Sequence, residues 1–484
     1  MHASIIIKIL GSLLMLFSLL ANIPPMLISL GYKDGMFYSF LVSMLAIFGL
    51  GALLFLSTLK TKKDLGIRDG FLVVTLFWAV LGIVGCLPFL FSPALELSIT
   101  DAIFESLSGL TTTGATVISG LDPLPKSILF YRQLLQWLGG MGIIVLAISL
   151  LPMLGIGGMQ LYRAESPGPV KDNKLVPRLA ETAKALWLIY LSLTIACAMA
   201  YWLAGMDLFD AVSHSFATIA IGGFSTHDAS LGYFDNSAID FIAIIFMFIA
   251  GINFALHFIA WQRRSIKHYF SDPEVVFYSF ILFFVSIVTI AVLYFSNVYS
   301  NGLDSVTKGL FQVVSIATTT GFTTDDFNAW PLFLPYLLLY AAIIGACAGS
   351  TGGGMKVVRI LLIFKQGIRE VQRLIHPKAV IPVKLGRNPV PDRIIESVWG
   401  FFAVYVMAFM LMLLALLATG LDIVTAFSAV GACINNLGPG LAGVAETYGN
   451  LSVMAKWILC VAMLLGRLEV FTLLVLFTPM FWKR

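Results

Sequence analysis

The chain has 484 residues, of which 59% are hydrophobic and 12% are charged, and its mean hydropathy is +0.93. Soluble globular domains carry about 25% charged residues, so this composition excludes a water-soluble enzyme of several domains. The net charge of +4 is too small to indicate a nucleic-acid partner. The 5 cysteines lie in apolar stretches without a metal-ligand spacing, and we interpret them as core thiols. The composition predicts a polytopic integral membrane protein.

Ten apolar runs are long enough to cross a membrane, which takes about 20 residues. They cover residues 5–29, 37–59, 70–91, 128–151, 183–204, 237–261, 275–296, 331–364, 395–419 and 453–479. No cleavage-site pattern follows the first run, so we interpret it as a retained span and not as a signal peptide. The sequence therefore predicts an all-α membrane protein with ten transmembrane helices.

Basic residues gather in alternate loops of this predicted topology. Residues 60–69, 152–184, 262–274, 365–394 and the C-terminal tail together hold 21 of the 30 Lys and Arg. Because cytoplasmic loops carry the excess of Lys and Arg, both termini are predicted to be cytoplasmic. Acidic residues concentrate in the opposite loops, where they would attract cations. They are Asp101, Asp122, Asp207, Asp210, Asp228, Asp235, Asp304, Asp325, Asp326, Asp422 and Glu446.

Four outer loops share one pattern, in which a Gly-centred polar stretch follows a short helical segment. In the first two loops the segment opens at Asp101 or Asp210, and the key glycine lies 13 residues further on. The key glycines of the four loops are Gly114, Gly223, Gly321 and Gly438. Their spacing predicts a repeat near 100 residues. The predicted units are a two-span extension at 1–69 and four repeats at 70–165, 166–268, 269–388 and 389–484.

The short segments 101–110 and 210–219 cannot cross a membrane, so we expect them to enter and return as pore loops. Irregular backbone is tolerated at membrane depth only where it is buried in protein or lines a water-filled cavity. Four such loops around one axis would form a ring of carbonyl oxygens that replaces the water shell of a cation. The predicted filter residues are Thr111, Thr112, Thr113, Gly114, Ala220, Ile221, Gly222, Gly223, Thr318, Thr319, Thr320, Gly321, Asn435, Asn436, Leu437 and Gly438.

This arrangement of four span–pore helix–span units resembles the Trk/Ktr/HKT superfamily of potassium transporters. The two additional N-terminal spans and the length resemble its bacterial Trk uptake systems, and the resemblance covers the whole chain. It implies selectivity for K⁺ over Na⁺, because all four key positions are glycine. It also implies that the coordinating carbonyls belong to Thr111, Thr112, Ala220, Ile221, Thr318, Thr319, Asn435 and Asn436. The fourth loop departs most from the Thr-Thr-Thr-Gly pattern of the first and third.

A Gly-rich stretch at 345–354 interrupts the run at 331–364. It is interpreted either as a packing kink or, preferably, as a flexible loop in the pore below the filter. A phosphate-binding loop is excluded because the lysine is displaced and no Ser or Thr follows it. The resemblance implies an intramembrane gate here. The gate candidates are Gly345, Gly349, Ser350, Thr351, Gly352, Gly353, Gly354, Lys356 and Arg467.

Arg467 is a gate candidate because it lies within a predicted span, where a charge costs at least about 2.5 kcal/mol. We hypothesise that it faces the pore just under the filter and limits K⁺ flow. The alternative is a structural ion pair with another repeat. Glu469 follows at a spacing that does not share a helix face with Arg467.

The inner loops 163–184 and 365–393 are basic and favour either anionic lipid or a cytosolic partner. The resemblance implies a ring of nucleotide-binding TrkA-type subunits, a homodimer, and a place in the bacterial cytoplasmic membrane. It also implies that K⁺ is the transported ligand. No nucleotide motif is present in the sequence, so we expect any nucleotide to bind to the partner and no nucleotide or covalent cofactor on this chain.

The predicted function is therefore inward K⁺ movement through a gated filter. The alternative is a Na⁺- or H⁺-coupled symporter with alternating access. Such folds usually have inverted repeats and an ionisable site at the midplane. Here the repeats share one orientation, and we expect only Arg467 and Glu469 to lie deep. An intramembrane enzyme is excluded because no paired acids, His cluster or Ser/His pair is visible in the spans.

Overall fold

The structure is a computed structural model that describes residues 3–59, 67–149, 176–331, 333–386, 388–468, 476 and 479–482. Within these residues the fold is almost entirely helical, as expected for an all-α protein. A single antiparallel pair, β1 (Lys384–Leu385) and β2 (Asn388–Pro389), forms a small hairpin in which Lys384 faces Pro389 and Leu385 faces Asn388.

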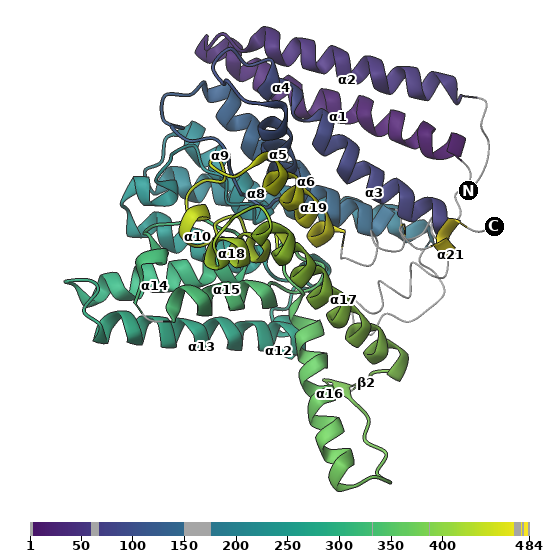
Figure 1. Ribbon diagram of the computed structural model, residues 1–484, viewed down its shortest axis with the longest axis vertical. Helices are drawn as coiled ribbons and strands as arrows, with labels where there is room; N and C mark the ends of the chain where they lie inside the picture. The colour runs from purple at the N-terminus through teal and green to yellow at the C-terminus, as the bar shows by residue number, and fades with distance from the viewer. Residues whose placement is uncertain are drawn as a thin grey trace.

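Long helices occupy the positions of the predicted spans (Figure 1). They are α1 (Ala3–Tyr32), α2 (Phe37–Ser57), α3 (Ile67–Val84), α6 (Lys126–Ser149), α8 (Val176–Leu203), α13 (Pro273–Phe295), α17 (Asp392–Leu417) and α19 (Val453–Arg467). Among the described residues, six helices are long and apolar enough to cross a membrane, and one bent pair makes a seventh. The chain is thus a multi-pass membrane protein, while the count of ten spans stays a prediction.

Two predicted spans are divided in the structure. The run 237–261 forms α10 (Ser237–Ala250) and α11 (Phe254–Gln262), which meet at a 91° bend. The sequence analysis expected one regular helix here. Asn253 explains the difference, because its side chain accepts a hydrogen bond from the Ala255 N–H (2.8 Å) and starts a new helix. The run 331–364 is divided into α15 (Leu334–Ile344) and α16 (Val357–Ile375) around the Gly-rich stretch.

Short buried helices precede the four Gly-centred loops. They are α5 (Ile99–Leu110), α9 (Leu208–Ala220), α14 (Gly302–Ala317) and α18 (Ile423–Ile434). Side chains of Ser98, Asp207, Asn301 and Asp422 cap their N-termini. Although these helices are polar in part, most of their residues are buried, because they pack between the longer helices.

The remaining elements are connections at the two ends of the molecule. They are α4 (Leu87–Leu90), η1 (Ser230–Phe234), α12 (Lys267–Ser271), η2 (Phe327–Ala329), η3 (Ala442–Val444) and α21 (Pro479–Trp482). The start of α1 and α21 lie on the same edge of the molecule (Figure 1). The Arg68 guanidinium also reaches the Phe481 carbonyl oxygen at 3.5 Å.

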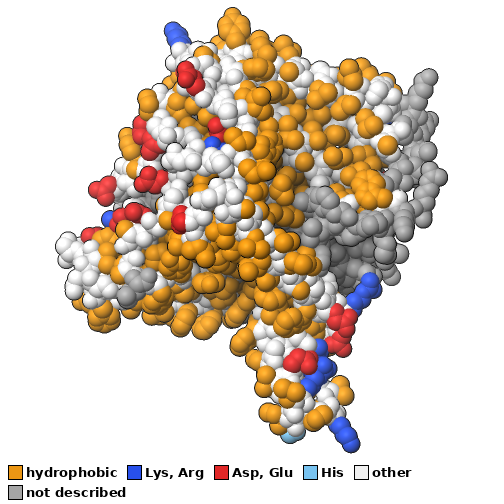
Figure 2. Space-filling model, viewed as in Figure 1, with side chains coloured by type: hydrophobic (Ala, Val, Ile, Leu, Met, Phe, Trp, Pro, Cys, Tyr) orange, Lys and Arg blue, Asp and Glu red, His pale blue; other side chains and the backbone are white. Residues whose placement is uncertain are grey.

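The surface is largely apolar, and most of its charged side chains lie on one edge and around the projecting part (Figure 2). Acidic side chains gather along the edge of the molecule opposite to the two termini, and α16 projects from the body with Lys and Arg beside it (Figures 1 and 2). The helix α16 continues to Ile375, so its second half occupies part of the stretch that the sequence analysis treated as the loop 365–394. All five cysteines are free and buried, which confirms their interpretation as core thiols.

Candidate functional site

The four Gly-centred loops adopt one backbone conformation. In each loop a residue with left-handed φ is followed two positions later by the key glycine, also with positive φ. The pairs are Thr112 and Gly114, Ile221 and Gly223, Thr319 and Gly321, and Asn436 and Gly438. Their φ values lie between 53° and 96°, a region that costs residues with a side chain about 1–2 kcal/mol. The second and fourth loops share this geometry although their sequences differ from Thr-Thr-Thr-Gly.

The key glycines form a closed ring of contacts between loops. A Cβ atom added at Gly114 would overlap the Gly222 carbonyl oxygen of the second loop. The same relation joins Gly223 to Thr320, Gly321 to Leu437, and Gly438 to Thr113. Each glycine thus lies against the carbonyl that precedes the next key glycine, and the fourth contact returns to the first loop. The structure therefore brings the four predicted filter stretches together around one axis.

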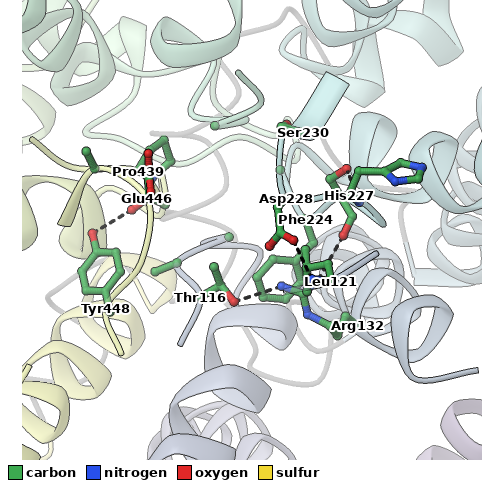
Figure 3. Close-up of a pocket in the computed structure, with 17 residues that line it drawn as sticks. Thr116, Leu121, Arg132, Phe224, His227, Asp228, Ser230, Pro439, Glu446 and Tyr448 are labelled. Carbon is green, nitrogen blue, oxygen red and sulfur yellow. Dashed lines mark hydrogen bonds between the residues drawn. The ribbon is translucent and has the colours of Figure 1, made fainter. Parts of the chain in front are cut away.

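A cavity of about 90 Å³ opens over this ring, and all four key glycines line it. Pro439, Glu446 and Tyr448 lie on one side of it, with Phe224 and Asp228 across from them (Figure 3). One water needs about 10–15 Å³ of such space, so the cavity has room for several waters or a partly hydrated cation.

A buried ion pair braces the first two loops. Arg132 of α6 and Glu105 of α5 pair at 2.8 Å (Nε to Oε1), and both side chains are at most 1% exposed. The Arg132 guanidinium also donates to the Ser225 carbonyl (3.0 Å), and the second Glu105 oxygen accepts from the Val117 N–H (2.9 Å). The sequence analysis expected deep charges only at Arg467 and Glu469, which is wrong. Arg132 lies inside the predicted span 128–151. A charged residue within a span is a signal of a functional or paired site, and the sequence analysis did not use it.

His227 forms a second charged cluster at the rim of the cavity. Its Nδ1 lies 2.5 Å from Asp122 Oδ1, and its Nε2 lies 3.3 Å from Asp210 Oδ2. Burial disfavours the charged ring, but the hydrogen bonds to the two carboxylates outweigh it and raise the pKa of His227 above 6.5. The hydrogen bond to His227 in turn lowers the pKa of Asp122. The His227 imidazole, at the mouth of the cavity, is therefore protonated more readily than a free histidine.

The Gly-rich stretch 345–354 lies directly against the loop ring. The Gly353 N–H donates to Thr319 Oγ1 (2.7 Å), and the Gly354 N–H donates to the Asn435 carbonyl (3.1 Å). Thr351 Oγ1 donates to the Ile219 carbonyl at the end of α9 (2.9 Å). Ser350 and Thr351 are fully buried. This stretch therefore packs against residues that precede the key glycines in the second, third and fourth loops.

Two further elements hold the stretch in place. Glu274, in the first turn of α13 and 5% exposed, accepts from the Ala348 N–H (2.7 Å) and the Val358 N–H (3.2 Å). The bend between α10 and α11 supplies backbone bonds, since the Cys347 N–H donates to the Gly251 carbonyl and the Phe254 N–H to the Gly349 carbonyl, both at 3.0 Å. Neither Glu274 nor the bend was predicted as part of the site.

Arg467 ends α19 and touches the same stretch. Its guanidinium donates to the Thr351 carbonyl (3.1 Å) and to the Gly139 carbonyl of α6 (3.3 Å), and the residue is 7% exposed. Lys356 Nζ donates to the Gly352 carbonyl (2.5 Å). Glu469 lies outside the described residues. Two cationic side chains therefore hold carbonyl oxygens of the stretch 345–354.

A family model described as "Cation transport protein", of the TrkH family, matches residues 38–484. The chain belongs to the TrkH family. It is therefore a transport protein and not an enzyme, as the sequence analysis expected.

Relatives of high identity cover the whole chain. The "Trk system potassium uptake protein TrkH" of Halomonas elongata is 58% identical over 484 residues, and that of Escherichia coli K12 is 58% identical over 483, each covering 100% of both chains. A crystal structure of "the Potassium Transporter TrkH from Vibrio parahaemolyticus" matches with a TM-score of 0.93 and 54% identity over 100% of both chains. The family assignment thus agrees with the resemblance noted from the sequence.

Proposed function

We propose that this chain is the K⁺-conducting membrane subunit of a potassium-uptake system in the bacterial cytoplasmic membrane. The observation that carries the proposal is the closed ring of four glycine loops, together with the potassium-uptake names of relatives at 58% identity. The repeat boundaries are proposed as predicted, at 70–165, 166–268, 269–388 and 389–484 after the extension 1–69. Both termini are placed in the cytoplasm, because the basic loops lie on that side.

Carbonyl oxygens of the four loops replace the water shell of K⁺ in this proposal. The left-handed residues and glycines turn the backbone so that successive carbonyls leave the helical direction. The C-terminal ends of α5, α9, α14 and α18 meet the ring and add negative partial charge there. The proposed filter comprises the sixteen residues predicted from the sequence, from Thr111 to Gly438. Its chemistry comes from the backbone, so the non-threonine loops are compatible with it.

The stretch 345–354 is the proposed gate. The hydrogen bonds of Gly353 to Thr319 and of Gly354 to Asn435 support this proposal, because both partners belong to the proposed filter. Conduction requires this stretch to leave the axis, which breaks the bonds from Arg467 to Thr351 and from Lys356 to Gly352. In this proposal the described arrangement is the non-conducting one.

Downhill entry suffices for uptake. A membrane potential of about 100 mV is worth about 2.3 kcal/mol per charge, or roughly 50-fold accumulation. The coupled-symport alternative needs an ionisable site that exchanges its partners. The buried acids of the described spans and pore helices include Glu105 and Glu274. Both are engaged, Glu105 by Arg132 and Glu274 by two backbone N–H groups.

The cytoplasmic face is the proposed docking surface for a ring of TrkA-type nucleotide-binding subunits, and the chain is proposed to form a homodimer. The projection of α16 and its basic residues support this placement (Figures 1 and 2). Lys and Arg of this face also suit anionic lipid headgroups.

Reconstitution of the purified protein in liposomes tests the proposal. A K⁺ gradient without Na⁺ or H⁺ gradients is expected to drive K⁺ flux well above the Na⁺ flux measured after ion exchange. Flux that appears only when a Na⁺ or H⁺ gradient is added would instead establish symport. Flux that appears only with a cytosolic partner would assign opening of the gate to that partner.

A further inference from the structure

The second loop lacks the side-chain bonds that stabilise the other three. Threonine hydroxyls pair within the first loop (Thr111 to Thr113) and within the third (Thr318 to Thr320), both at 2.7 Å. In the fourth loop, Asn436 Nδ2 donates to the Thr113 hydroxyl at 2.9 Å. The second loop reads Ala-Ile-Gly-Gly from 220 to 223 and has no polar side chain in this stretch. Any side-chain hydrogen bond that supports this stretch must therefore come from a residue outside it.

Gln136 of α6 supplies the missing bonds. Its Nε2 donates to the Gly222 carbonyl at 2.6 Å, and its Oε1 accepts from the Phe224 N–H at 3.1 Å. These two bonds lie on either side of Gly223, and the Gln136 side chain is fully buried. One carboxamide thus fixes the peptide groups that flank a key glycine, in the way that a backbone pairing partner would.

The close approach of Gln136 also accounts for the second glycine of this loop. A Cβ atom at residue 222 would overlap the Gln136 carboxamide carbon. In the first and third loops the equivalent positions are Thr113 and Thr320, whose side chains make the internal bonds. The second loop therefore has a glycine that admits an external amide where the first and third loops have a threonine.

We infer that Gln136 is the positioning residue of the second filter loop and that K⁺ over Na⁺ discrimination depends on its carboxamide. The inference rests on the proposed function, because it assigns a role within the proposed filter. Gln136 acts through the Gly222 and Phe224 peptide groups. The Gly222 carbonyl in turn lies against Gly114, so a displacement of the second loop would also displace the first.

Liposome flux of Gln136→Leu tests this role, with the K⁺/Na⁺ flux ratio as the readout. We expect the ratio to fall about tenfold or more, since the two buried hydrogen bonds that hold the Gly222 and Phe224 peptide groups are lost. Gln312→Leu is the matched control. Gln312 of α14 is also fully buried, but its side chain makes a single long hydrogen bond, from Nε2 to the Phe322 carbonyl at 3.5 Å. Phe322 belongs to the third loop, where the threonine pair persists. It is expected to keep the unaltered ratio.

A second variant distinguishes loss of the positioning role of Gln136 from a failure of the protein to fold. Gln136→Glu keeps an acceptor for the Phe224 N–H but removes the donor to the Gly222 carbonyl, so we expect a lowered K⁺/Na⁺ ratio in a folded protein. An unaltered ratio in either folded variant overturns the inference, as does an equal fall in Gln312→Leu. If the unaltered protein itself fails to discriminate K⁺ from Na⁺, the proposed function is wrong, and the inference is wrong with it.

Discussion

Each key glycine is set by two independent constraints at the residue scale. Its positive φ disfavours any side chain, and the carbonyl of the neighbouring loop occupies the place where a Cβ atom would lie. Relieving one constraint does not relieve the other. Glycine is thus required at Gly114, Gly223, Gly321 and Gly438 for reasons of backbone packing, apart from any role in ion selection.

Gly223→Ser tests this requirement. The new Cβ would overlap the Thr320 carbonyl, and the strained φ adds about 1–2 kcal/mol, so both loops must shift. We expect the K⁺/Na⁺ flux ratio to fall about tenfold or more, because 1.4 kcal/mol corresponds to a factor of ten. Gly205→Ser is the control, since Gly205 also has positive φ but has nothing within 4 Å of the added Cβ. A ratio unchanged by Gly223→Ser would contradict the ring geometry.

Arg467→Gln tests whether the hydrogen bonds of Arg467 hold the proposed gate closed. It removes charged hydrogen bonds to the Thr351 and Gly139 carbonyls, and such bonds contribute about 1.5–3 kcal/mol each. We expect K⁺ flux in liposomes to rise about tenfold or more. Arg373→Gln, on the exposed part of α16, serves as the control. Equal flux in both variants and the unaltered protein would leave Arg467 with a structural role only.

The His227 cluster predicts a pH dependence of stability at the outer rim. Because the folded pKa of His227 is raised, its ion pairs contribute fully below the unfolded value of 6.5 and are lost as pH rises through the folded pKa. The melting temperature of the purified protein is therefore expected to fall over this window. His227→Gln should remove this part of the pH profile. An identical profile in the variant would show that other groups cause it.

At the scale of elements, the two divided helices form one assembly. The bend of α10 and α11 and the stretch between α15 and α16 exchange backbone bonds in both directions. The bent pair α10 and α11 thus holds the stretch 345–354 in place. If the proposed gate moves away from the bend, these hydrogen bonds break. We therefore expect the stability of the bend to affect opening of the gate.

Asn253→Ala tests this coupling, because Asn253 caps α11 at the bend. Loss of such a cap costs about 0.5–2 kcal/mol, and we expect a lower melting temperature together with a several-fold higher K⁺ flux. Asn236→Ala removes a similar cap, a bond to the Ala238 N–H at the start of α10. It should lower the melting temperature without changing flux. Parallel effects of both variants on flux would refute the coupling.

The sequence predicted the short helices well, and the reasons are local. Residues 101–110 and 210–219 were expected, and α5 and α9 cover Ile99–Leu110 and Leu208–Ala220, because capping residues and the Gly stretch mark both ends. The bend at Gly251–Asn253 was missed because its neighbours are uniformly apolar. The roles of Arg132, Gln136 and Glu274 were missed for another reason. Their partners are distant in sequence and become visible only in the fold.

The whole molecule is polarised, with acids gathered on one edge and termini on the other (Figures 1 and 2). Cysteine labelling tests the proposed orientation. Lys33→Cys is expected to react with a membrane-impermeant thiol reagent from outside intact cells, and Lys378→Cys only after permeabilisation. Both positions are exposed, whereas the five native cysteines are buried and give a low background. The reverse pattern of labelling would invert the topology.

The glycine ring joins four stretches of one continuous chain, and this has an evolutionary consequence. In a pore built from four identical subunits, every substitution appears four times around the axis. Here each quarter of the ring is encoded separately, so the second can carry Gly222, with Gln136 bonded to it, where the first and third carry threonine. A ring encoded within one polypeptide thus permits each loop to differ in sequence from the others, provided that each glycine still fits the loop beside it.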